Sequence, residues 1–354
     1  MTSVNNKVVS NSMRGRDIRI DVIKGISILL VLWGHTIQNL TPNETSYYCD
    51  WVFKTIYSFH MPLFALINGY LFYSSQRKRN FGEVLHSRIC NLLVPIAVWT
   101  TLDWILGSVL HKKIVITEWM TIFTGNMLWF LWSILAANLV LIVAEKKIKS
   151  QWGRLIWLAA VFFMMYLFPN AELNLFLYPY VVLGFYYKKY SKLFAEIKKY
   201  GWISILLFIL LLPFYDESSF IYTTGISLWK SDIAFQKHLL IDTYRYIIGL
   251  MGSSAIIYIV CVTTEKLKAL DKCLSVCGRY TMQIYIMQCF FFKFFGMMRR
   301  KIEYRFTDNI FLLNAVSRDI LIAMPFCLIL LLICLFASKL FERNRLLNKI
   351  LFGR

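Results

Sequence analysis

Long apolar runs, separated by short polar segments, dominate the pattern of the chain. A helix needs about 20 mostly apolar residues to cross a bilayer, and most runs are close to that length. They predict an all-α fold, a polytopic membrane helical bundle of about ten transmembrane helices. These helices are expected at 20–40, 56–74, 89–110, 126–144, 155–169, 174–187, 201–215, 241–263, 279–296 and 313–338. The three runs between 155 and 215 are short, which favours tilted or shielded helices.

The basic residues between the apolar runs predict the topology. With a cytoplasmic N-terminus, the segments on the cytoplasmic side hold 26 Lys and Arg and those on the other side hold 10. Cytoplasmic loops of membrane proteins are rich in Lys and Arg, so both termini are expected to be cytoplasmic. The chain is then a cytoplasmic N-terminal segment (1–19), one transmembrane domain (20–338) and a basic cytoplasmic tail (339–354).

Composition favours a membrane protein over a soluble one. Of the 354 residues, 58% are hydrophobic and 17% charged, and the mean hydropathy is +0.55; a soluble domain is less apolar. The net charge of +19 is scattered through short loops, so membrane lipids rather than nucleic acid are the expected contacts. The eight cysteines lack a ligand pattern, so no metal is expected. Five of them are expected in the core: Cys90, Cys261, Cys289, Cys327 and Cys334.

The first apolar run carries three ionisable residues, Asp21, Lys24 and His35. Lys24 and His35 are eleven residues apart, which places them on one helix face about 16 Å apart along the axis. Ionisable groups at membrane depth are costly and indicate a functional site that faces the protein interior. Alternatively, Lys24 only extends to the headgroups as an orientation signal, and His35 is a satisfied polar residue near the far interface.

The second predicted helix holds His60 near its outer end and Asn68 and Gly69 at mid-membrane depth. A buried amide needs partners, and a glycine allows close approach of another backbone or a ligand. Ordinary helix packing explains this segment equally well.

A basic cluster follows this helix, at Arg77–Arg79 and Arg88. Such a cluster binds anionic lipid headgroups or a phosphate-bearing ligand. The lipid or topology interpretation is favoured for Arg77–Arg79, and Arg88, next to the following span, is the better ligand candidate.

Two later helices carry further polar groups. Asp242 and Arg245 are three residues apart, a spacing that permits an ion pair within one helix. Tyr285 and Gln288 belong to a helix that is polar for a membrane span, so this helix is expected to face a cavity rather than lipid.

Six segments, in this order and spacing, resemble acyltransferase family 3, the multispan O-acyltransferases that modify cell-surface and secreted glycans. They are DVIKGISILLVLWGH, SFHMPLFALINGYLF, RICNLLVPIAVW, WFLWSILAANL, YPYVVLGFYYKK and GRYTMQIYIMQ. The family's first span has an arginine, ten intervening residues and a histidine. Here Lys24 takes the arginine position, which keeps the cation without the bidentate fork, and His35 takes the histidine position. Many members have a histidine at Gln288, which therefore inherits no acid–base role.

The resemblance implies transfer of an acyl group from cytoplasmic acyl-CoA, with acetyl-CoA as the expected donor, to a sugar hydroxyl. The acceptor is a surface polysaccharide or its lipid-linked precursor, and the location is the bacterial cytoplasmic (inner) membrane. His35 is the expected general base, with Lys24 and Asp21 as further catalytic candidates. Lys24 and Arg88 are the candidates for binding CoA phosphates. The acceptor candidates are His60, Asn68, Tyr285 and Gln288.

Two alternatives stay open at this point. The acyl group passes directly to the acceptor or through an acyl-histidine intermediate. Many spans, buried polar residues and a basic inner face also fit a transporter or flippase for a glycan intermediate. A second copy of the chain and glycan-assembly proteins are further candidate partners.

Overall fold

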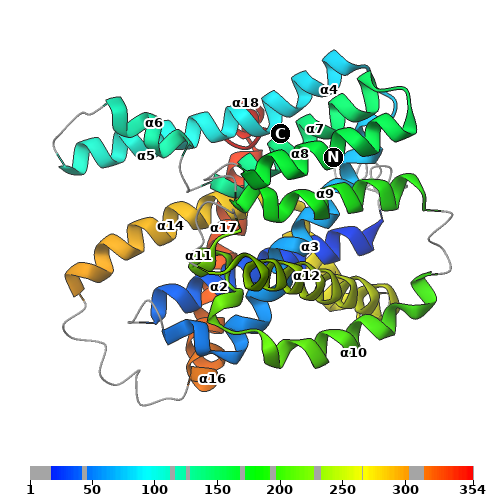
Figure 1. Cartoon of the computed structure of the whole chain (residues 1–354). Coiled ribbons are helices and arrows are strands. Elements are labelled where there is room, and N and C mark those ends of the chain that lie inside the picture. Colours follow the sequence, from blue (N-terminus) through cyan, green and yellow to red (C-terminus); the bar gives the residue numbers. More distant parts are fainter. Residues whose placement is uncertain are drawn as a thin grey trace.

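The structure, a computed structural model, describes residues 17–41, 46–111, 116–124, 128–167, 172–191, 197–226, 233–264, 266–302 and 315–353. Every regular element within these ranges is a helix (Figure 1). The longer helices are α2 (Ile18–Leu40), α3 (Trp51–Gln76), α5 (Val94–His111), α7 (Trp129–Lys147), α8 (Gln151–Leu167), α9 (Glu172–Lys189), α10 (Gly201–Leu211), α12 (Phe235–Thr263), α13 (Lys268–Arg279), α14 (Thr281–Ile302) and α17 (Met324–Glu342). The short helices are α4 (Phe81–Arg88), α6 (Ile116–Thr124), α11 (Ile221–Thr224), α16 (Ala315–Arg318) and α18 (Arg345–Phe352). Short 3₁₀ or π elements are η1 (Ser46–Cys49), η2 (Ile89–Leu93), η4 (Ile197–Tyr200), η5 (Leu212–Phe214), η6 (Glu217–Ser219) and η7 (Asp319–Ala323).

The predicted all-α fold is confirmed, because a helix lies within each of the ten apolar runs. Within the described ranges, five helical stretches are long and apolar enough to cross a membrane: Ile18–Leu40, Phe81–Val109, Trp129–Lys147, Phe235–Thr263 and Ala315–Glu342. Two shorter apolar helices, Gln151–Leu167 and Gly201–Phe214, accompany them. The number of ten crossings and the cytoplasmic position of both termini stay predictions.

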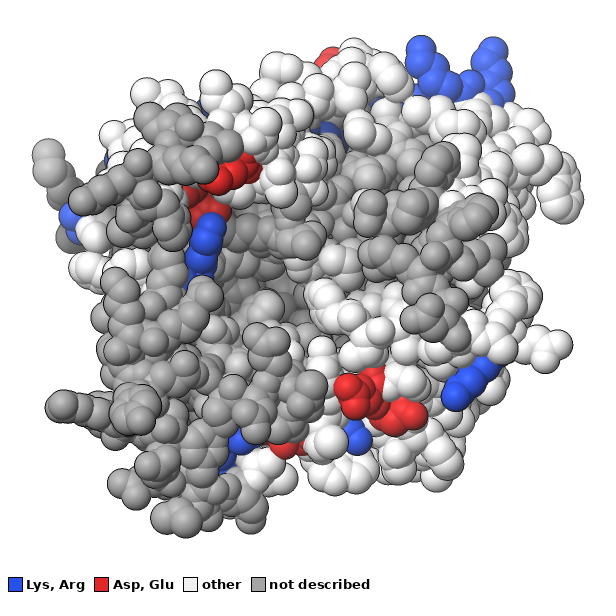
Figure 2. Space-filling view, turned by 60° about the vertical axis from the view of Figure 1, so that its left-hand side comes forward, with Lys and Arg blue, Asp and Glu red and all other residues white. Residues whose placement is uncertain are grey.

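The distribution of charge on the surface also fits a membrane protein. On the face shown in Figure 2, most of the described acidic and basic side chains lie in an upper and a lower group. The described residues between these groups are mostly uncharged, although a basic side chain on the left, next to acidic ones, reaches the middle of the view. Charged groups avoid the hydrocarbon layer because their desolvation is costly.

Residues 264–279 connect two of the predicted membrane helices, and most of this segment forms a further helix, α13, which the apolar runs did not predict. The helix is amphipathic, so its average hydropathy is too low for a span although one side is apolar. It packs closely along α2. A side chain at Gly25 would collide with the Leu274 carbonyl, and one at Gly278 with the Asp21 carbonyl. The two glycines therefore permit backbone contact that fixes the first turns of α2.

Helix α3 lies at the centre of the bundle and packs against α2, α9 and α12 (Figure 1). The approach of a backbone to Gly69 that the sequence suggested is confirmed. A Cβ at Gly69 would meet the Val181 carbonyl of α9, and one at Gly184 would meet the Leu66 carbonyl of α3.

The expectation that five cysteines lie in the core holds only in part. Cys327 and Cys334 are buried, and Cys90 and Cys289 are partly buried. Cys261 is exposed. Helix α12 is apolar around most of its circumference, so its sequence does not indicate which side faces the protein interior.

Candidate functional site

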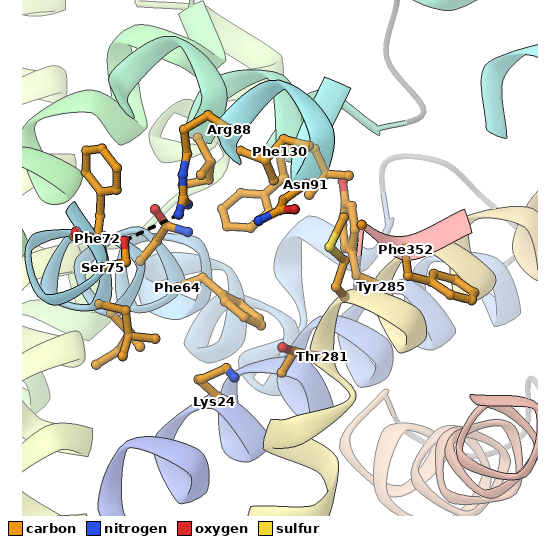
Figure 3. A pocket seen from close by; sticks show the side chains of 18 of the residues that line it. Lys24, Phe64, Phe72, Ser75, Arg88, Asn91, Phe130, Thr281, Tyr285 and Phe352 are labelled. Atoms are coloured by element: carbon orange, nitrogen blue, oxygen red, sulfur yellow. Dashed lines mark hydrogen bonds between the residues drawn. The ribbon is translucent and has the colours of Figure 1, made fainter. Parts of the chain in front are cut away.

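A cavity of about 290 Å³ lies between α2, α3, α7, α14 and the junction of α4 with η2. We call it the cation cavity, because Lys24 and Arg88 reach it from opposite sides (Figure 3). Phe352 and Gly353, at the end of α18, also line it. Its polar wall residues besides the two cations are Asn68, Ser75, Asn91, Thr281 and Tyr285.

Arg88 has few partners in this cavity. Its guanidinium donates to the Ser75 hydroxyl at 3.3 Å (Figure 3) and lies 5.0 Å from the centroid of the Phe72 ring. Its Nε is buried and has no hydrogen-bond partner, and no carboxylate of the described chain lies within ion-pair distance. A partly buried cation without a counter-ion is unfavourable, so the site suits an anionic ligand.

Lys24 stands in the second turn of α2 and is held by that helix. Its Nζ lies 3.9 Å from the Asp21 carboxylate one turn earlier. Asp21 is buried and does not line the cation cavity, and its backbone lies against Gly278 of α13. Asp21 therefore pairs with Lys24 but does not form part of the cavity wall.

A second, smaller cavity of about 40 Å³ follows along α2. We call it the histidine cavity, because both His35 and His60 line it. Its other walls come from α7, α9, α12 and the segment before and within α11. Most of the remaining lining is aromatic: Tyr57, Trp129, Phe176, Tyr215, Phe220, Tyr222 and Tyr285 of α14.

The hydrogen bonds of His35 fix the state of its ring. Nδ1 lies 3.0 Å from Oε1 of Gln38, and the same oxygen accepts from the Tyr57 hydroxyl at 2.7 Å. An amide oxygen only accepts hydrogen bonds, so a neutral His35 carries its proton on Nδ1 and has its lone pair on Nε2. This is the tautomer that a general base at Nε2 requires.

His60 is held in the same way by its own helix. Its Nδ1 lies 2.8 Å from the carbonyl of Ile56, and its ring centroid lies 4.7 Å from that of Tyr57. Because a carbonyl oxygen also only accepts, Nε2 of His60 is again the unprotonated nitrogen.

The two cavities adjoin each other. Val31, Met61 and Tyr285 line both of them. Lys24, Val31 and His35 follow one another at helical spacings of seven and four residues, so one face of α2 runs from the cation cavity to the histidine cavity. The predicted stripe thus faces two adjoining cavities rather than one.

The structure separates the other sequence candidates. Asn68 lines only the cation cavity, although we expected it to contact the acceptor with His60. Gln288 is fully buried outside both cavities, and its amide has no hydrogen-bond partner. The expected Asp242–Arg245 ion pair is confirmed, at 2.8 Å. Arg245 also lines the histidine cavity, which its spacing from Asp242 did not indicate.

These features define a helical membrane protein whose ionisable residues converge on two adjoining internal cavities. Residues 17–339 match the acyltransferase domain family, and the chain therefore belongs to acyltransferase family 3, as its six segments indicated.

Similar curated proteins include two nodulation proteins. Nodulation protein NolL of Mesorhizobium japonicum is 30% identical over 211 residues, which cover 54% of this chain and 53% of the relative. Nodulation protein NolL of Sinorhizobium fredii is 32% identical over 183 residues, which cover 50% of each chain. The chain thus spans about half the length of the curated relatives it matches. No solved structure matches the chain.

Proposed function

We propose that this protein is a multi-pass O-acyltransferase of the bacterial cytoplasmic membrane. It moves an acyl group, with acetyl as our candidate, from cytoplasmic acyl-CoA to a sugar hydroxyl of a surface polysaccharide or its lipid-linked precursor. The observation that carries this proposal is the shared wall of the two cavities. Cations line one cavity, histidines line the other, and Val31, Met61 and Tyr285 belong to both.

The cation cavity suits the donor. Arg88 and Lys24 offer positive charge to the CoA phosphates, and the unpartnered Nε of Arg88 and Oδ1 of Asn68 offer hydrogen-bonding capacity. A volume of about 290 Å³ holds only part of such a molecule. We therefore assign this cavity to the pantetheine arm, with its phosphates near the cations.

The histidine cavity suits the chemistry. Nε2 of His35 takes the proton of the acceptor hydroxyl, and the oxygen forms a bond to the thioester carbonyl carbon. The carbon–sulfur bond then breaks, and the proton passes to the departing thiolate. Gln38 keeps His35 in the required tautomer throughout.

The acceptor is expected to meet the aromatic part of the histidine cavity. The exposed ring of Tyr222 at the rim can pack against the apolar face of a sugar, and the tyrosine and serine hydroxyls of the cavity can hydrogen-bond to the hydroxyl group that enters it. A glycan acceptor also agrees with the functions implied by the family resemblance. Glycan-assembly proteins or a second copy of the chain are candidate partners.

The test compares surface glycans from cells with and without the gene by mass spectrometry. Loss of acyl groups from an otherwise intact glycan supports the proposal, and membranes that contain the protein should transfer label from radioactive acetyl-CoA to extracted glycan. Loss of the surface glycan itself, with no acyl transfer in membranes, would instead support a transporter or flippase.

A further inference from the structure

The segment Tyr215–Ile226, which we call the aromatic loop, forms one wall of the histidine cavity. Five of its residues line that cavity and none lines the cation cavity: Tyr215, Ser219, Phe220, Ile221 and Tyr222. Phe220 is buried against the rings of Phe53 and Tyr215, so the loop packs onto the start of α3. Tyr222 is 55% exposed at the rim.

Arg245 of α12, which is 2% exposed, donates hydrogen bonds to several groups of the aromatic loop. Nε of Arg245 donates to the Ser219 carbonyl at 2.8 Å. The two terminal nitrogens donate to the carbonyls of Ser218, Phe220 and Gly225 at 2.8, 3.1 and 2.5 Å. Arg245 also donates to the Thr224 hydroxyl.

The charge of Arg245 is balanced beneath the loop. Asp242 accepts from it at 2.8 Å, and the Tyr166 hydroxyl and Nε2 of His238 lie 3.2 and 3.3 Å from the same carboxylate. Without the guanidinium, the buried carbonyls of Ser219 and Gly225 would lose their donor, whereas those of Ser218 and Phe220 would keep the hydroxyls of Thr224 and Thr223. A buried carbonyl without a donor is costly. A lysine keeps the charge but has three donors on one nitrogen, so it cannot span this fan of carbonyls.

We propose that Arg245 is a positioning residue that fixes the aromatic loop against the histidine cavity, and that this loop selects the glycan acceptor. The second part rests on the proposed function, in which the histidine cavity receives the acceptor hydroxyl. Because the loop is absent from the wall of the cation cavity, it acts on the acceptor and not on the donor.

The test uses the full-length protein in nanodiscs and the variant Arg245→Lys. The donor is radioactive acetyl-CoA, and the acceptor is lipid-linked oligosaccharide extracted from cells that lack the gene. We expect the KM for the oligosaccharide to rise by about tenfold or more, as expected from the loss of one or more buried hydrogen bonds. The KM for acetyl-CoA should stay within about twofold of the wild type. Hydrogen exchange of the peptide that contains residues 216–226 should become faster.

A matched control is Arg318→Lys. Arg318 is another buried arginine, paired with Asp50 and Asp319 at 2.5 and 3.1 Å, and it lines neither cavity. We expect it to change neither KM, even if the protein becomes less stable. If Arg245→Lys does not accumulate, Tyr222→Ala tests the same loop without disturbing the buried charge, and it should raise only the oligosaccharide KM.

A direct binding measurement separates this inference from the proposed function. The oligosaccharide is titrated onto each protein in the absence of donor. Wild-type binding without any acyl transfer would contradict the proposed function, and weaker binding by Arg245→Lys would still support the role of the loop. Unchanged oligosaccharide binding and KM in both Arg245→Lys and Tyr222→Ala would overturn the inference.

Discussion

The cation cavity and the histidine cavity differ in how their polar groups are partnered. In the cation cavity, Nε of Arg88 and Oδ1 of Asn68 are buried without hydrogen-bond partners. In the histidine cavity, Nδ1 of His35 and Nδ1 of His60 each lie within hydrogen-bond distance of an acceptor. All three guanidinium nitrogens of Arg245 donate hydrogen bonds. Buried polar groups normally find partners. The first cavity therefore suits a ligand that supplies them, and the second holds its side chains in a fixed geometry.

The strongest test of this difference is His35→Gln in the preorganised cavity. Glutamine can hydrogen-bond but cannot take a proton at neutral pH, so turnover should fall by about 10²–10⁴-fold, nearly as far as in His35→Ala. The measurement is acyl transfer in membranes, normalised to protein level. His86→Gln, an exposed histidine of α4 outside both cavities, should be unaffected. Near-normal turnover in His35→Gln would exclude His35 as the base.

The role of the wall that the two cavities share is tested by Val31→Phe. A larger side chain in the shared wall should separate donor from base and reduce turnover by up to about 10²-fold, because small misplacements of reacting groups are costly. Binding of acetyl-CoA, measured by calorimetry, should persist. Val22→Phe is the matched control: Val22 is equally buried, at 2% exposure, in the same helix but lines neither cavity. An equal loss of turnover in both variants would indicate a general packing defect rather than a specific role of the shared wall.

A smaller effect is expected from Arg88→Ala in the cation cavity. Loss of a charge-assisted contact to phosphate should raise the KM for acetyl-CoA by about tenfold, with turnover at saturation largely kept. Arg88→Lys should recover part of the affinity. Arg79→Ala removes an exposed charge nearby and should leave the donor KM unchanged. A normal donor KM in Arg88→Ala would remove Arg88 from the donor site.

The smallest effect is expected at Lys24, whose charge is already paired with Asp21. Lys24→Ala should raise the donor KM by a few fold, roughly what one partly screened charge contributes, whereas Lys24→Arg should retain most activity. Steady-state kinetics in membranes measures both. If Lys24→Ala changes neither KM nor turnover, Lys24 is only an orientation signal.

The sequence predicted the main helices and the ionisable stripe because both depend on local spacing. Apolar runs give the helices directly, and the interval of eleven residues places Lys24 and His35 on one face. The closeness of Val31 to both cavities follows from the same interval. Helix α13 was missed because an amphipathic helix has no long apolar run. The close backbone contacts of Gly25 with α13 and of Gly278 with α2 depend on the fold and are not indicated by the sequence.

The rest of the site depends on contacts between distant segments. The pairing of Asp242 with Arg245 is local and was expected, but the carbonyls that Arg245 holds lie 20 to 27 residues earlier in the chain. Nothing in the spacing of α12 indicates which loop returns to it. Gln288 was expected to face a cavity because its helix is polar, and the fold instead buries it outside both.

The small volume of the histidine cavity bears on how long a substrate the protein can modify. A space of about 40 Å³ has room for roughly a hydroxymethyl group and a water molecule, not for a sugar ring. The acceptor would therefore insert one hydroxyl arm and leave the remainder of the chain outside, along the rim near Tyr222. On the proposed function, the protein would enclose only this arm of its acceptor, so we expect it to accept both short precursors and long chains.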